Sequence, residues 1–154
     1  TSDGAIVVIH DGDLMRMGND PRKVKDLTLA EIRTVDIGSK RGPQYAGEHV
    51  PTLAEVIDYA RGKFRINIEL KYNVPDLQLA AAVVALLREK QFLDQVVITS
   101  LDYASLRQIE ELQPSLETGL IVTAAVGNVI KTDPAAGTKV KVDTRDGSYL
   151  GRVS

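Results

Sequence analysis

Short apolar runs recur along this chain, and the stretches between them are long enough to hold a helix. The runs occupy residues 5–9, 96–99 and 118–123, and residues 64–71 form a further expected strand in which apolar and polar side chains alternate. The continuous run at 5–9 predicts a strand buried on both faces, as in a parallel sheet. Parallel strands need long crossover connections, so the order predicts an α/β fold of successive βα units, in an open sheet or a barrel.

Helix signals fill the connections between these runs. Thr28 and Thr52 each stand three residues before a glutamate, a capping-box pattern that predicts a helix beginning at each threonine. Residues 12–27 and 36–50 are expected to be loops, the first with a turn signal at residues 18–21. The helices are expected over residues 28–35, 52–62, 75–90 and 102–112. Their core-facing residues are expected to be Leu53, Val56, Ile57 and Ala60, then Leu79, Ala82, Val83, Leu86 and Leu87, and finally Leu106, Ile109 and Leu112.

Composition excludes several classes of protein. A chain of 154 residues with a net charge of -2 can bury a core but has no overall field to attract nucleic acid or anionic lipid. There is no apolar run of about 18 residues to cross a membrane, and no signal peptide is visible, which favours a cytoplasmic location. The absence of cysteine excludes a disulfide framework and thiolate metal sites. The chain begins without methionine, almost inside the first run, which indicates a fragment of a longer protein.

Polar residues stand where the predicted strands end. His10 and Asp11 follow the first predicted strand, Glu69 and Lys71 end the second, and Ser100 ends the third. The carboxyl ends of parallel strands converge on the ligand site in barrels and open sheets, so these residues are expected at one site.

Each of these residues also has a structural interpretation. A histidine after a strand is often a structural hydrogen bonder, and Glu69 with Lys71 fits an exposed ion pair on an edge strand. The opposite face of that strand carries Ile66, Ile68 and Leu70, which favours Glu69 and Lys71 pointing together into a barrel. A carboxylate buried there needs a cation or a metal ion beside it.

Several motifs follow one another in a fixed order along the chain. They are His10-Asp11 with Leu14 and Arg16, residues 26–32, residues 36–39, residues 47–56, residues 66–71 with Glu69 and Lys71, residues 97–102 and residues 106–114. Taken in order, these motifs resemble the glycerophosphodiester phosphodiesterases. The resemblance covers roughly residues 1–128 and implies a partial TIM-type barrel. It further implies hydrolysis of glycerophosphodiesters to glycerol 3-phosphate and an alcohol.

The resemblance implies roles for three residues. His10 matches a histidine of general acid–base catalysis, Glu69 a ligand of Mg²⁺ or Ca²⁺, and Lys71 a catalytic, substrate-binding lysine that neutralises phosphate charge. A hard cation and an ammonium group suit the charge of a phosphodiester transition state. His49 matches no motif and is expected at the surface. The family also places a His-Arg pair and a Glu-x-Asp metal pair before the position of Thr1, so the isolated chain is expected to be nearly inactive.

The composition changes near the end of this match, which predicts one domain over residues 1–128 and a linker with a β-hairpin tail over 129–154. Alternation at 139–144, the Asp146-Gly147 turn signal and residues 149–153 predict the hairpin. It resembles the C-terminal hairpin of bacterial elongation factor P, a tRNA-contacting family. The residues that would face phosphate, or simply solvent, are Lys139, Lys141, Arg145 and Arg152.

Three hypotheses of function follow. The leading one is a phosphodiesterase segment acting on a glycerophosphodiester. The second is an RNA- or ribosome-binding module that uses the tail. The third is a non-catalytic scaffold whose open sheet edges pair two copies in a homo-oligomer.

Overall fold

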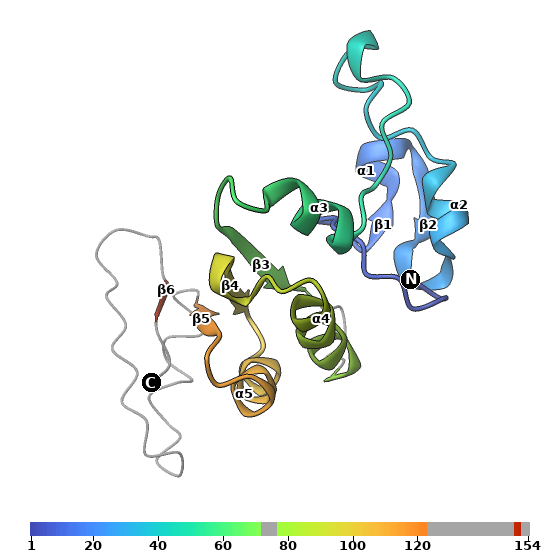
Figure 1. Cartoon of the computed structure of the whole chain (residues 1–154). Coiled ribbons are helices and arrows are strands. Elements are labelled where there is room, and N and C mark those ends of the chain that lie inside the picture. The colour runs from blue at the N-terminus through green and yellow to red at the C-terminus, as the bar shows by residue number, and fades with distance from the viewer. Residues whose placement is uncertain (72–76, 123–149, 152–154) are drawn as a thin grey trace. The chain divides into compact units, whose positions relative to one another are not determined.

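The computed structural model describes residues 1–71, 77–122 and 150–151 (Figure 1). These residues belong to two compact units, Thr1–Ala60 and Arg61–Ser154. Each unit has its own secondary structure and is described by itself.

The first unit is built from short elements. Its strands and helices are β1 (Asp13–Leu14), α1 (Met15–Gly18), β2 (Asp20–Lys23), α2 (Leu29–Arg33) and α3 (Leu53–Ala60), with 3-10 turns at Val24–Asp26 and Pro43–Tyr45. Strands β1 and β2 pair antiparallel. Asn19 adopts a left-handed conformation at φ 59°, which reverses the chain after α1 where the turn signal predicts it. The loop expected over 12–27 therefore contains elements too short for any periodicity to reveal.

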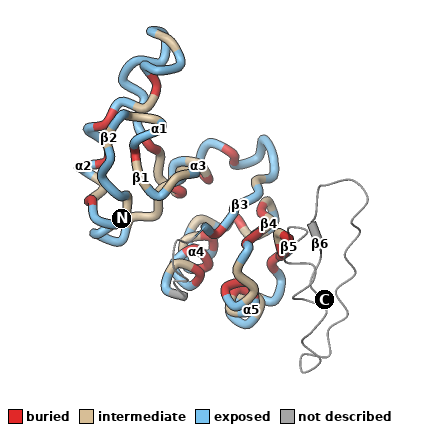
Figure 2. The backbone as a smooth tube through the Cα atoms, turned by 180° about the vertical axis from the view of Figure 1, so that it is seen from behind, coloured by how far each residue is buried: buried red, intermediate tan, exposed pale blue. Residues whose placement is uncertain are grey.

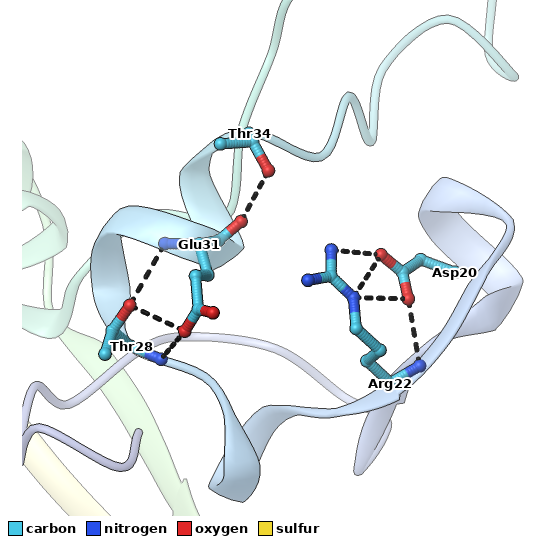
Figure 3. Close-up of polar contacts among 5 residues, drawn as sticks. All are labelled: Asp20, Arg22, Thr28, Glu31 and Thr34. Atoms are coloured by element: carbon cyan, nitrogen blue, oxygen red, sulfur yellow. Dashed lines mark hydrogen bonds and ion pairs between the residues drawn. The ribbon is translucent and has the colours of Figure 1, made fainter.

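Both predicted capping boxes are present. At the start of α2, Oγ1 of Thr28 accepts a bond from the amide of Glu31 at 3.2 Å, and the Glu31 carboxylate accepts one from the amide of Thr28 at 2.8 Å (Figure 3). Thr52 and Glu55 make the same pair of bonds, at 3.2 Å and 2.8 Å. Helices α2 and α3 begin as predicted because these bonds satisfy amides that the first turn leaves free. Beyond α3, Gly62 lies at φ 69°, the conformation of a helix-ending glycine.

The predicted strand at residues 5–9 is wrong as stated. Only an isolated antiparallel bridge forms, between Val7 and Thr52. Backbone bonds from the amide of Val8 to the carbonyl of Pro51 and from the amide of Leu53 to the carbonyl of Ile6 flank it. A β-branched run favours an extended backbone, but a strand needs a partner along its whole length, and here the partner is the short turn before α3. Burial is also one-sided, because the side chain of Val8 is 43% exposed.

A small apolar core holds the first unit together. Val7 and Ile9 are partly buried and pack against this core. They lie on the side of the extended segment opposite Val8. Along α3, Leu53, Ile57 and Ala60 are buried as predicted, and Val56 is half-buried (Figure 2). The buried members of the core cluster are Leu14, Leu27, Ile32, Val35 and Val50.

The second unit carries the predicted parallel sheet. Its elements are β3 (Ile66–Leu70), α4 (Leu77–Glu89), a 3-10 turn (Leu93–Gln95), β4 (Val96–Ser100), α5 (Tyr103–Leu112), β5 (Glu117–Ile121) and β6 (Leu150–Gly151). The sheet order is β3-β4-β5-β6. β4 pairs in parallel with β3 and with β5, while β6 pairs antiparallel with β5. The prediction of α/β architecture from parallel βα units is confirmed, with α4 and α5 as crossovers.

The buried face of α4 agrees in part with the predicted one. Val83 and Leu87 are buried and Leu79 and Leu86 are half-buried, but Ala82 is exposed. Most residues of α4 are apolar, so periodicity does not single out one stripe, and packing against α5 selects it. The buried positions are Ala80, Val83, Val84 and Leu87. In α5, Leu106 and Ile109 are buried as predicted, whereas Leu112 is exposed.

The tail hairpin predicted over residues 139–153 lies outside the described residues, except for β6. The same holds for the predicted domain boundary between 128 and 129. β6 continues the sheet by pairing Leu120 with Gly151 and Ile121 with Leu150. Among the helices that the structure describes, none combines the length and the apolar character needed to cross a membrane.

Candidate functional site

His10, Asp11 and Arg16 form a chain of contacts in the first unit. Nδ1 of His10 lies 2.6 Å from Oδ1 of Asp11, and Nε of Arg16 donates to Oδ2 of the same carboxylate at 2.6 Å. The Asp11 side chain is 24% exposed, against 69% for His10 and 60% for Arg16. The carboxylate is thus the sheltered member, with a more exposed cation on one side and a more exposed imidazole on the other.

The charge of Asp11 is stabilised by these two partners. The Arg16 guanidinium, followed by His10, lowers the pKa of Asp11 from 3.8 to about 2. Hydrogen bonds and positive charge both favour the ionised carboxylate. At neutral pH Asp11 is therefore a fixed acceptor with no proton to donate.

Arg16 is positioned by α1. The Asp13 carboxylate accepts a bond from the amide of Met15 at the start of this short helix, at 3.0 Å. Nζ of Lys40 donates to the carbonyls of Met15 and Arg16, the first two residues of α1, both at 3.1 Å. Helix carbonyl oxygens carry partial negative charge, so a nearby ammonium group is stabilised.

Lys40 belongs to a loop that is organised around one carboxylate. Asp36 accepts bonds from the amides of Gly38 and Gly47 at 2.8 and 2.9 Å, and from both the amide and the hydroxyl of Ser39. These bonds, the Ser39 hydroxyl first, hold the pKa of Asp36 well below its usual range. A Cβ on Gly38 would lie 1.9 Å from the carbonyl oxygen of Tyr45, so the close approach requires glycine.

Glu69 and Lys71 lie at the carboxyl end of β3 in the second unit. Both are exposed, and so is Asn67, the residue two positions before Glu69 on the same face of the strand. In the register of the sheet Glu69 stands beside Thr99, whose Oγ1 donates to Oδ1 of Asn67 at 2.9 Å. The side of β3 that carries the predicted site residues is therefore polar, while Leu70 on the other side is buried. Glu69 is not the buried carboxylate that the barrel interpretation considered.

Ser100 has a structural role. It is 1% exposed and stands beside Leu70 on the face of the sheet opposite Glu69. Its hydroxyl donates to the carbonyl of Leu70 at 2.9 Å and accepts from the amide of Asp102 at 3.0 Å. The expectation that Ser100 joins the polar site residues is wrong, because strand alternation turns its side chain toward the other face.

The predicted site residues thus fall into two groups. His10 and Asp11 belong to the first unit, and Glu69 and Lys71 to the second. Their convergence on one site stays a prediction. His49 is exposed, as its lack of a motif predicts.

The carboxylates that the structure describes do not form a complete metal site. Within that part of the chain, no group of three or more histidine, aspartate or glutamate side chains is arranged to hold an ion. Mg²⁺ and Ca²⁺ take six or more oxygen ligands, and one carboxylate such as Glu69 supplies at most two. Glu69 fits a single position in such a site and no more.

Arg16 belongs to one of the sequence motifs, which predicts no role for it. The signal was weak, because an arginine five residues after an aspartate in a polar loop is ordinary. Its meaning depends on α1, which turns the chain so that the guanidinium meets the Asp11 carboxylate.

Known proteins match this chain along most of its length. A family model described as "Glycerophosphoryl diester phosphodiesterase family" matches residues 1–149. A glycerophosphodiester phosphodiesterase of Caldanaerobacter subterraneus is 38% identical over 125 residues, covering 79% of this chain and 51% of the relative. One of Bacillus subtilis is 36% identical over 140 residues, covering 80% of this chain and 47% of the relative. The chain therefore spans about half the length of these curated relatives.

Solved structures agree with the fold. A phosphodiesterase of Oleispira antarctica in complex with the product sn-glycerol-3-phosphate superposes with a TM-score of 0.72 at 28% identity, over 85% of this chain and 56% of that one. A glycerophosphodiester phosphodiesterase of Agrobacterium tumefaciens gives 0.66 at 28% identity, over 77% and 49%. The fold of this chain is thus shared with these solved phosphodiesterases.

Proposed function

Because this chain belongs to the glycerophosphoryl diester phosphodiesterase family, we propose that it is a segment of an enzyme that hydrolyses glycerophosphodiesters. The products are glycerol 3-phosphate and an alcohol. The product complex of the Oleispira antarctica neighbour supports this substrate class. The observation that carries the proposal is the contact between His10 and Asp11, because it orients a proton-transferring group.

His10 acts as the general acid–base. An ionised carboxylate accepts but does not donate, so Asp11 requires a proton on Nδ1 of His10. The second ring nitrogen, Nε2, then takes a proton from the nucleophile or gives one to the leaving alkoxide. Histidine suits this exchange because its ordinary pKa is close to neutrality.

Lys71 and Glu69 serve the phosphate side of the reaction. Negative charge on the phosphoryl oxygens grows toward the transition state, and the ammonium group of Lys71 neutralises it. Glu69 would contribute one carboxylate to a Mg²⁺ or Ca²⁺ site. When bound, such an ion polarises a phosphoryl oxygen as a Lewis acid.

A chimera tests the proposal. The part of this chain that matches the Caldanaerobacter relative replaces the corresponding segment of that enzyme. Release of glycerol 3-phosphate from a glycerophosphodiester is then measured with Mg²⁺ or Ca²⁺. We expect turnover by the chimera and a loss of about 10²-fold or more in His10→Ala, the range for removing a general acid–base. Glu69→Ala should cause a comparable loss.

The chain supplies its own matched control. His49→Ala removes the other histidine, which is exposed and carries no proposed role, so turnover should be unchanged. Equal turnover in His10→Ala and His49→Ala would contradict the assignment of His10.

A further inference from the structure

We propose that Arg16 is a positioning residue that, acting through Asp11, sets the ring tautomer and orientation of His10. This inference rests on the proposed function for the role of His10 in the reaction. It adds a residue that acts through Asp11 to the residues on which proton transfer depends.

The geometry of the Asp11 carboxylate is the first argument. Each oxygen has a different partner, with Nδ1 of His10 at Oδ1 and Nε of Arg16 at Oδ2, both at 2.6 Å. Contacts this short are typical of charge-assisted hydrogen bonds. With both oxygens engaged, the carboxylate cannot rotate about its terminal bond without losing one partner. Arg16 therefore fixes the direction in which Oδ1 faces the imidazole.

The chemistry of the acceptor is the second argument. An ionised carboxylate offers only lone pairs, so the ring nitrogen facing it must carry a hydrogen. In the neutral imidazole this places the proton on Nδ1 and the lone pair on Nε2. Arg16 also keeps Asp11 ionised, since its guanidinium is the largest contribution to the low pKa of that carboxyl.

The support behind Arg16 is the third argument. Its backbone carbonyl, with that of Met15, accepts bonds from Nζ of Lys40, so α1 is held by this side chain. The guanidinium consequently reaches Asp11 from an anchored backbone. An exposed ion pair contributes little to stability, so its effect is expected on the orientation of His10 rather than on folding.

Nitrogen-15 NMR of the imidazole rings tests the inference on this chain directly. Spectra are recorded at mildly alkaline pH, where an ordinary imidazole is neutral, and the ratio of Nδ1–H to Nε2–H tautomer is measured for each histidine. The chain contains only two histidines, so His49 is an internal reference in every sample. We expect His10 to favour Nδ1–H and His49 to favour Nε2–H, as a histidine side chain in water does.

Variants separate the positioning role from a structural one. Arg16→Gln should lower the Nδ1–H to Nε2–H ratio of His10 by roughly threefold to fivefold, the effect of one exposed charge contact. Asp11→Ala should abolish the preference. Arg22→Gln is the matched control, because Arg22 pairs with Asp20 in the same unit through contacts of 2.6 to 3.0 Å (Figure 3) and should leave His10 unchanged.

Two results would overturn the inference. One is a wild-type His10 that favours Nε2–H, and the other is an Arg16→Gln ratio equal to that of wild type. Should Arg16→Gln fail to fold, Arg16→Lys keeps the charge but not the directed Nε–H, and an unchanged ratio there would equally refute a directed contact. The NMR measurement needs no turnover, so an unexpected tautomer ratio contradicts the role of Arg16 alone. An inactive chimera would instead contradict the proposed function.

Discussion

Replacing Ser100 by alanine removes one buried hydroxyl that joins β3 to the turn after β4. The hydroxyl makes two hydrogen bonds, to the Leu70 carbonyl at 2.9 Å and from the Asp102 amide at 3.0 Å. A typical intramolecular hydrogen bond contributes about 1 kcal/mol, so the loss is about 2 kcal/mol of unfolding free energy. That difference corresponds to a factor of roughly 30 in an equilibrium constant.

Amide hydrogen exchange measures this loss where it should occur. The chain has two compact units, so a single global transition is a poor reporter, whereas exchange resolves each element. Exchange of the amides in β3 and β4 should accelerate by roughly 30-fold in Ser100→Ala. Ser115→Ala is the control, because this exposed hydroxyl should change stability by no more than about 0.5 kcal/mol.

The pattern of exchange decides the matter. An acceleration of less than about twofold in β3 and β4 would mean that water replaces the hydroxyl at no cost, contrary to its burial. Equal acceleration in the amides of α2 and α3 would mean that the effect is not local. Either result would refute the argument that the Ser100 hydroxyl stabilises the end of β3 beside Glu69 and Lys71.

Further predictions concern acid, packing and the tail. The pKa of Asp11 is lowered to about 2, so its contacts stabilise the fold at pH values above the ordinary pKa of 3.8, and this stabilisation is lost as the pH falls toward 2. Carbon-13 NMR of the Asp11 carboxyl should show a titration midpoint near pH 2, and this midpoint should rise in Arg16→Gln. An unchanged midpoint in the variant would contradict this. Leu14→Ala, at a fully buried position, should destabilise the first unit by about 2–5 kcal/mol, measured by amide hydrogen exchange in α2 and α3, and a loss below about 1 kcal/mol would contradict the assigned core. If the tail binds RNA, neutralising Lys139 and Lys141 should weaken a salt-sensitive interaction with tRNA in filter binding, and no binding at low salt would remove that hypothesis.

Local signals were the reliable part of the sequence. Thr28 and Thr52 mark helix starts because a capping box needs only four consecutive residues, and both boxes form as written. The strands at 96–99 and 118–123 were also recognisable, since each is a short apolar run flanked by polar residues. In these cases the residues that determine the structure lie within one helical turn or one short apolar segment.

Features that depend on distant partners escaped prediction. The run at residues 5–9 looks like a buried strand, yet Val8 is exposed because neighbours, not the run itself, determine which sides are covered. The inward face of α4 was ambiguous because most residues there are apolar. Of the site, the identity of His10, Glu69 and Lys71 came from ordered motifs. The link from Asp11 to Arg16 needed the turn that α1 introduces.

The antiparallel pairing of β6 gives the sheet of the second unit two unequal borders. In a closed barrel of parallel strands, the position next to β5 would belong to another parallel strand, but Leu150–Gly151 lies there in the opposite direction. Extension by a parallel strand at that border requires β6 to leave. Among the residues that the structure describes, β3 has no neighbouring strand on its other side, so the open border of this sheet is the strand carrying Glu69.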